Sequence, residues 1–247
     1  MALLEKMFKR IYGTMGIPDT IDKGMVKYFA TEFFGAVEKG YGAELISIDY
    51  DTPDYLVLRN LQENVYQFSA AKNYQQLKDT TRALIGEDGK LRTWTEFKNA
   101  AYKINNEHVT SWLAAERNNA ITCGQASAIW QRAQENKDVL PILEFHAIID
   151  GHTTDICRNL NGVRKPIDDP FWDLYYIPNH FGERSDILQQ PGGRITPTTD
   201  ITFPDKIPPM FKTNLAKNGL VFPKDHPYYT GVPHQVSEQA NKLLNRG

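Results

Sequence analysis

The chain has 247 residues, with 28 Lys and Arg against 30 Asp and Glu, a formal net charge of -2 and 41% hydrophobic residues. This composition is close to that of soluble globular proteins and excludes a wholly disordered chain. The balanced charge lacks the excess of cations typical of a protein that wraps DNA, so we expect DNA contact to be local at most. The length allows one large domain or two small ones.

The cysteines and the N-terminus exclude further classes. Cys123 and Cys157 are too few for a disulfide framework or for a zinc site built mainly of thiolates. Glu5 and Lys6 interrupt the apolar stretch at the N-terminus, so it does not read as a secretory signal. No run approaches the roughly 20 apolar residues of a membrane-spanning helix. We therefore expect no contact with a membrane.

Residues 1–136 have a helical pattern, and the clearest helix begins at Thr52. Thr52 is a suitable N-cap, Pro53 fits the first helical position and Asp54 places an acid in the first turn. Apolar residues then recur at helical spacing, at Leu58, Leu61, Val65 and Phe68. The helix is predicted to end near Gly86, where turn residues gather.

A second long helical stretch follows Thr93 or Thr95. It contains no proline between Leu91 and Asn136. Trp94, Trp112 and Trp130 are each 18 residues apart, about five turns at 3.6 residues per turn, so a continuous helix would place them on one face. We interpret them as a core stripe.

The pattern after Asn136 predicts a small α+β module. Residues 139–149 form a mostly apolar run typical of a buried strand. Residues 153–160 fit one or two helical turns, which Gly162 would help to end. Residues 163–167 fit a short strand whose pairing is limited by proline.

The last part of the chain is rich in proline. Eight of the 14 prolines fall between Pro191 and Pro233, where they prevent long helices. Apolar anchors along this segment indicate that it lies on its own body or on a neighbouring subunit, and residues 235–245 fit a short last helix. We therefore predict an α+β protein with a mainly helical N-terminal domain (1–137), a small α+β module (138–190) and an extended proline-rich C-terminal arm (191–247).

Residues 146–184 concentrate the residue types that carry chemistry: His146, Asp150, His152, Asp155, Cys157, Arg158, Asp168, Asp169, Asp173, His180, Glu183 and Arg184. Cys157, His180 and His152 are the candidate zinc ligands, against the alternative of a buried cysteine and hydrogen-bonded histidines. Cys157 with His180 as its base is a candidate nucleophile. No strong metal, hydrolase or phosphate-binding motif is present.

Other polar segments fit structural roles better. Asp169 next to Pro170 is typical of a turn, and Phe171 and Trp172 supply apolar area for a core. The adjacent aspartates Asp168 and Asp169 leave Mg²⁺ as an alternative, although this ion needs several converging oxygens.

Several segments in order resemble one family. They are WLAAERNNAITCGQASAIW (112–130), an apolar strand leading into Asp150, Cys157 followed by LNG (160–162), DDPFWD (168–173) and PNHFGERSDI (178–187). Together they resemble the phage Mu protein F-like minor head proteins, also called phage head morphogenesis proteins, in a variant similar to those of Bacteroidetes phages and prophages. The resemblance extends from about Asp51 to Asp186.

The resemblance carries over to individual positions. It implies structural roles for Asp150, Gly162, Asp169, Phe171, Trp172, Pro178, Asn179 and Arg184. Cys157 and His180 match members of the family's Cys and His set, whereas Thr154, Glu183 and Ser185 stand where further Cys or Arg residues are expected. We therefore expect no cofactor, with zinc as the metal that this incomplete set would hold, and an ion pair between Arg184 and Asp150.

The resemblance implies a minor capsid protein with no enzymatic activity. Such a protein binds the portal, and also the major capsid or scaffold protein as a further candidate, in the capsid interior near the portal vertex, after assembly in the host cytoplasm. In the arm, the expected partner-binding residues are Phe211, Phe222, Tyr228 and Tyr229. Two alternatives stay open: a metal-dependent nuclease or hydrolase that uses residues 146–184, and a DNA-binding tail that uses Lys206, Lys212, Lys217 and Lys224.

Overall fold

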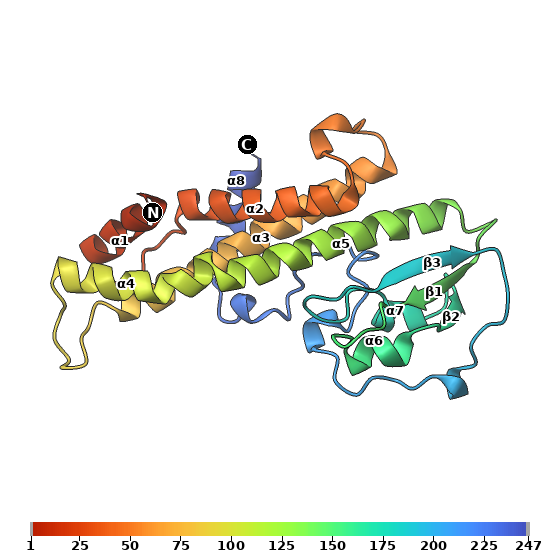
Figure 1. The fold of residues 1–247 in the computed structure, drawn as a ribbon. Helices are drawn as coiled ribbons and strands as arrows, with labels where there is room; N and C mark the ends of the chain where they lie inside the picture. Colours follow the sequence, from red (N-terminus) through yellow and green to blue (C-terminus); the bar gives the residue numbers. More distant parts are fainter. Residues whose placement is uncertain (1, 246–247) are drawn as a thin grey trace. The chain divides into compact units, whose positions relative to one another are not determined.

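The computed structural model describes residues 2–245, which form two compact units. Residues 2–33, 63–116 and 226–245 make up the first, which we call the helical unit. Residues 34–62 and 117–225 make up the second, the sheet unit, which contains strands β1 to β3 (Figure 1). The boundaries fall within three long helices, α2 (Lys23–Tyr41), α3 (Pro53–Arg82) and α5 (Ser111–Glu135), so each contributes residues to both units.

The helical unit adds three shorter helices, α1 (Ala2–Thr14), α4 (Trp94–Val109) and α8 (His234–Leu244). α4 begins with a capping box: the Thr93 backbone N–H donates to Glu96 Oε2 at 2.9 Å, and Glu96 N–H donates to Thr93 Oγ1 at 3.4 Å. This exchange satisfies two backbone donors that a helix N-terminus otherwise leaves unpaired.

The predicted start and apolar stripe of α3 are confirmed. Thr52 Oγ1 accepts from the Tyr55 backbone N–H at 3.3 Å, and Pro53 is the first helical residue. The four stripe residues Leu58, Leu61, Val65 and Phe68 are all fully buried. Within the helical unit, α8 packs its apolar face against α2 and α3 through the cluster Ile21, Val26, Ala70, Val236, Ala240 and Leu243.

The prediction of a continuous helix through the three tryptophans is wrong. The chain breaks at Thr110, whose φ of -122° and ψ of -96° are not helical, so α4 and α5 are separate helices. The predicted core stripe is right for Trp130, which packs against a core cluster, but wrong for Trp112, which is 40% exposed. Spacing alone could not reveal the break, since Thr110 is an ordinary helix residue by propensity.

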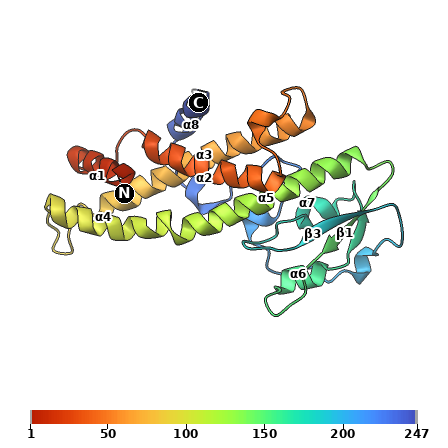
Figure 2. The ribbon, with the colours of Figure 1, turned by 45° about the horizontal axis from the view of Figure 1, so that its top comes forward.

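Three antiparallel strands form the sheet in the order β2-β1-β3, with β1 (Ile142–His146) in the centre. β2 (Arg164–Pro166) pairs Lys165 with Leu143, and β3 (Asp186–Gln190) pairs Ile187 with Phe145. Helices α6 (Asp155–Leu160) and α7 (Phe171–Tyr175) lie beside the sheet in both views (Figure 1 and Figure 2). Gly162, with φ of +78°, makes the turn between α6 and β2.

In the sheet unit, the sheet, α5, α6 and α7 all contribute to one apolar core cluster. Its largest members are Phe145, Trp172 and Tyr176, each fully buried. Their polar atoms are satisfied: Trp172 Nε1 donates to the Pro166 carbonyl at 3.0 Å, and the Tyr176 hydroxyl donates to the Ala126 carbonyl at 3.1 Å. These contacts fix α7 against β2 and α5.

The small α+β module is predicted correctly in kind but not in extent. The strand over residues 139–149 is reduced to β1, because Val139, Ile148 and Ile149 are 73%, 50% and 51% exposed. β3 and α7 were not predicted, since their short sequences carry little periodicity.

The proline-rich segment after Pro191 has only short 3₁₀ turns, η2 (Thr198–Asp200), η3 (Pro209–Phe211) and η4 (Pro227–Tyr229), before α8. This segment packs on its own chain, which is one of the two arrangements expected from the sequence; the other was packing on a neighbouring subunit. The predicted last helix is confirmed as α8, and so is the α+β fold class with a mainly helical body. The domain boundaries at 137 and 190 stay a prediction. Among residues 2–245, no helix combines the length and apolar character needed to cross a bilayer.

Candidate functional site

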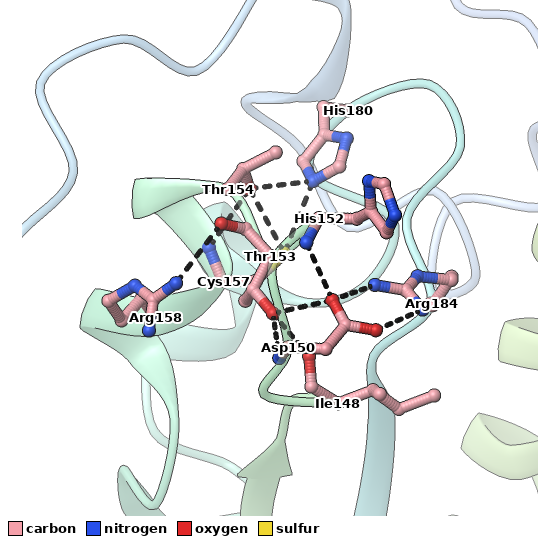
Figure 3. A network of polar contacts seen from close by, with 9 residues as sticks. All are labelled: Ile148, Asp150, His152, Thr153, Thr154, Cys157, Arg158, His180 and Arg184. Atoms are coloured by element: carbon pink, nitrogen blue, oxygen red, sulfur yellow. Dashed lines mark hydrogen bonds and ion pairs between the residues drawn. The ribbon is translucent and has the colours of Figure 1, made fainter.

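Two loops and one short helix of the sheet unit bring predicted polar residues together (Figure 3). The loop over residues 147–154 follows β1, α6 comes next, and residues 178–185 lead into β3. α6 begins where the Thr154 hydroxyl accepts from the Cys157 backbone N–H at 3.4 Å. This cap places the Cys157 side chain toward His180.

Arg184 and Asp150 form the ion pair that the sequence predicts. Arg184 Nη1 donates to Asp150 Oδ2 at 2.8 Å, and Nη2 donates to Oδ1 at 2.7 Å. The His152 backbone N–H also donates to Oδ1, at 2.8 Å. The hydrogen bonds from Arg184, and next the one from His152, hold the pKa of Asp150 well below its ordinary value. The pair ties the loop after β1 to the segment that precedes β3.

Cys157, His180 and Glu183 form a compact cluster beside this ion pair. Cys157 Sγ lies 3.2 Å from His180 Nε2 and 3.5 Å from Glu183 Oε1. One donor atom from each residue lies within 4.8 Å of the others. Cys157 and Glu183 are buried and His180 is half-buried. Burial first, and the charge of Glu183 second, raise the pKa of the Cys157 thiol.

The geometry also assigns the His180 tautomer. Nδ1 lies 2.8 Å from the Phe181 carbonyl oxygen, which can only accept, so Nδ1 carries the proton. The lone pair of Nε2 then faces Cys157 Sγ and the Thr154 hydroxyl, the latter at 3.0 Å. Nε2 is therefore available either as a hydrogen-bond acceptor or as a metal ligand.

His152 is not part of the three-atom cluster. Its side chain is exposed, and its backbone N–H donates a hydrogen bond to Asp150 Oδ1. Of the predicted set, the structure thus brings Cys157 and His180 together, and it adds Glu183 in place of His152. Sequence reasoning placed Glu183 among the polar residues of 146–184 and named it as a departure from the family pattern, but did not include it among the candidate ligands, although a carboxylate is itself a ligand type.

The other family-motif residues serve the fold. Asp169 Oδ1 accepts from the Phe171 backbone N–H at 2.8 Å at the start of α7, while Phe171 and Trp172 fill the core. The Asn179 backbone N–H donates to Glu183 Oε2. Pro178 follows a cis peptide bond.

Other polar residues of the 146–184 stretch lie elsewhere. His146 is exposed at the end of β1, and Asp173 pairs with Lys217 at 2.6 Å. The stretch therefore does not converge on one site.

The four residues predicted to bind a partner contact their own chain. Phe211 and Phe222 are fully buried, and Phe211 packs edge-on to Phe181 with ring centroids 5.1 Å apart. Tyr228 and Tyr229 are half-buried within the helical unit. A partner contact through Phe211 or Phe222 would need this segment to leave the core.

Sequence reasoning missed a buried ion pair in the helical unit. Lys72 Nζ lies 2.6 Å from Glu116 Oε2, and both side chains are sealed from solvent. The ammonium also lies 5.0 Å from the ring centroids of Phe29 and Tyr228. A signal existed, because Lys72 follows Phe68 by four residues and so continues the apolar stripe of α3.

Two buried histidines flank this pair. Burial first, and the charge of Lys72 second, lower the pKa of His108 and that of His226 to about 4. Both imidazoles are therefore uncharged at neutral pH. His108 Nε2 also lies 3.6 Å from Asp79 Oδ2.

Residues 71–187 match the model of a family described as phage Mu protein F like protein. Over this segment the chain is therefore similar to the phage Mu protein F-like family. The Mu F-like segment runs from the second half of α3 into β3, and it includes Asp150, Cys157, His180 and Arg184. It makes up just under half of the chain. A search of curated proteins and a search of solved structures found no match.

Proposed function

We propose that the protein is a minor capsid protein of a tailed phage or prophage. In this role it binds the portal, inside the procapsid near the portal vertex, and supports head assembly and the packaging or delivery of DNA. The observation that carries the proposal is the Mu F-like match over residues 71–187. Assembly in the host cytoplasm precedes this location in the virion.

Exposed apolar side chains of the sheet unit support a role in protein contacts. Ile148, Ile149, Leu174 and Phe181 are between 41% and 51% exposed; Leu174 lies in α7, and the other three lie in the loops that carry the polar cluster. Exposed apolar side chains that lie near one another are typical of protein–protein interfaces.

The chemistry of Cys157 argues against a cysteine nucleophile. A cysteine nucleophile acts as the thiolate and sits where substrate can reach it. Cys157 is 5% exposed, and its raised pKa keeps the thiol protonated. Asp169 and Asp173, further candidates for a hydrolase, are engaged in a helix start and a surface ion pair.

Co-purification with the portal protein of the same phage or prophage tests the proposal. The tagged full-length chain is expressed with the portal protein and recovered under native conditions. We expect the two to be recovered together, because a minor head protein must hold its place during assembly. Recovery of the chain without portal or capsid protein would overturn the proposal.

Point variants test the arm better than truncation, because cutting after Gln190 removes Phe211, Phe222 and α8 from their cores. We propose charge reversal of three exposed arm lysines to Glu: Lys206, Lys212 and Lys224. The matched control reverses three exposed lysines of the helical unit: Lys9, Lys27 and Lys103. If the arm docks the portal, only the arm variant loses recovery. If it instead binds DNA, the arm variant loses a salt-dependent affinity for DNA.

A further inference from the structure

We propose that Cys157, His180 and Glu183 together bind one divalent transition-metal ion, with zinc as the best fit. The ion would cross-link α6 to the segment over residues 178–185. This inference does not depend on the role in head assembly, since it rests on the geometry of the cluster alone.

The first argument is the buried carboxylate of Glu183. It is 4% exposed, and no cationic side chain of the described residues pairs with it. Arg184, its neighbour in sequence, is engaged with Asp150. The Asn179 backbone N–H donates a hydrogen bond to Oε2, while Oε1 faces Cys157 Sγ. Buried charges are usually paired with an opposite charge or bound to a metal. The Glu183 carboxylate has no such positive partner among the described side chains, and a bound metal ion would supply it.

The second argument is the spacing of the donor atoms. Zn–S bonds of about 2.3 Å and Zn–N or Zn–O bonds of about 2.0–2.2 Å place tetrahedral ligands about 3.5 Å apart. Cys157 Sγ lies 3.2 Å from His180 Nε2 and 3.5 Å from Glu183 Oε1. The side chains are therefore close to the ligand spacing that zinc needs, without a rearrangement of the backbone.

The third argument is the orientation of His180. Metal-binding histidines usually donate the N–H of the other ring nitrogen to a carbonyl or carboxylate, which fixes the tautomer. Here Nδ1 donates to the Phe181 carbonyl at 2.8 Å, and the lone pair of Nε2 faces the thiol.

The donor set selects the class of metal. Sulfur, imidazole nitrogen and carboxylate oxygen together favour zinc and similar ions, whereas Ca²⁺ and Mg²⁺ prefer oxygen alone. Three protein ligands leave one tetrahedral position for water. A pocket of about 20 Å³ opens beside the cluster, lined by Thr154 and His152 among others, and has room for about one water molecule. Binding converts the Cys157 thiol into a metal thiolate and releases its proton to solvent.

Cobalt is a direct spectroscopic probe for this site. The full-length chain is stripped of metal with a chelator and titrated with Co²⁺ under reducing conditions. We expect a thiolate-to-cobalt charge-transfer band, intense tetrahedral d–d bands and saturation at one ion per chain, with Zn²⁺ displacing the cobalt. Addition of Zn²⁺ is also expected to raise the melting temperature, because the ion binds only the folded ligand set.

Variants decide which residues are ligands. Cys157→Ser is expected to abolish the charge-transfer band, while His180→Gln and Glu183→Gln weaken Co²⁺ binding by at least about tenfold. Cys123→Ser is the matched cysteine control and His152→Asn the matched histidine control, and both are expected to bind as the unmodified chain does. Glu183→Gln is nearly isosteric, so it keeps the test decisive if Cys157→Ser does not fold.

The proposal is overturned if the unmodified chain shows no charge-transfer band. It is also overturned if Cys123→Ser removes the band, or if His152→Asn weakens binding while Glu183→Gln does not.

Discussion

The two units of the protein each contain a prominent ion pair, and the two pairs differ in their access to water. In the helical unit, the side chains of Lys72 and Glu116 are 0% and 6% exposed. In the sheet unit, those of Arg184 and Asp150 are 44% and 38% exposed. Both pairs have short contacts, so distance does not distinguish them. Solvent does.

The difference decides what each pair contributes. Inside a protein, two opposite charges depend on one another, because water no longer solvates either when its partner is removed. At the surface, water and dissolved ions replace a lost partner readily. The Lys72–Glu116 pair is therefore expected to be essential to the fold of its unit, and the Arg184–Asp150 pair to order loops with little effect on stability.

Removing one member of the sealed pair is the strongest test of this comparison. Glu116→Ala leaves the Lys72 ammonium buried without a counter-charge, and we expect a loss of about 3–5 kcal/mol in the free energy of unfolding. Denaturant unfolding followed by circular dichroism measures the loss.

A double variant separates the charge from the packing. Lys72→Met combined with Glu116→Leu removes both charges and keeps apolar volume, so it is expected to recover most of the lost stability. If the double variant is as unstable as Glu116→Ala, the cost comes from lost packing and the pair does not act through its charges.

The histidines beside the sealed pair predict a dependence on pH. His108 and His226 have a pKa of about 4 when folded, against an ordinary value of about 6.5, so the unfolded chain binds more protons between these values. Their stabilising contribution is present above pH 6.5 and is lost as the pH falls toward 4. At pH 5 the loss is on the order of 2 kcal/mol for each histidine.

Denaturant unfolding at pH 7 and pH 5 measures this loss. The control is His108→Gln, which is expected to be less stable at pH 7 but to lose less on acidification. An unchanged pH dependence in this variant would show that carboxylates, rather than buried imidazoles, cause the acid sensitivity.

The sequence predicts what depends on local pattern. The start and stripe of α3, the turn at Gly162 and the last helix all follow from capping, periodicity or turn chemistry. The Arg184–Asp150 pair was expected from the family resemblance, whereas the approach of Cys157 to His180 could not be read from the sequence. Each of these predictions rests either on residues that are neighbours in the sequence or on the pattern of a known family.

Features that depend on long-range packing could not be predicted. Lys72 and Glu116 are 44 residues apart, and no local rule joins them. Glu183 joins the cluster because the loop before β3 folds toward α6. The burial of Phe211 and Phe222 likewise depends on the path of a proline-rich segment, whose sequence indicates anchoring but not its direction.

In the sheet unit, the backbones of α2 and α5 approach each other closely at two glycines. A Cβ on Gly124 in α5 would lie 2.2 Å from the Val37 carbonyl oxygen in α2, and one on Gly40 would lie 1.9 Å from that of Ile121. These glycines let the two helices touch. Gly124→Ala is therefore expected to lower the free energy of unfolding by about 1–3 kcal/mol, despite the better helix propensity of alanine.

Gly35 supplies the matched control within α2. A Cβ there would meet no atom within 4 Å, so Gly35→Ala is expected to stabilise the chain by about 0.5–1 kcal/mol. Melting temperatures of the two variants should shift in opposite directions. A gain in both would mean that the helices separate at little cost.

The smallest effect on stability is expected at the exposed ion pair. Arg184→Gln removes the guanidinium, but water can solvate the Asp150 carboxylate, so the melting temperature should hardly change at neutral pH and less still at high salt. The local effect is clearer: the pKa of Asp150 should rise toward its ordinary value of about 3.9, since the hydrogen bond from Arg184 is the main cause of its low value. Carbon-detected NMR titration of Asp150 measures that rise. A loss of stability as large as that of Glu116→Ala would mean that solvent access is not what separates the two pairs.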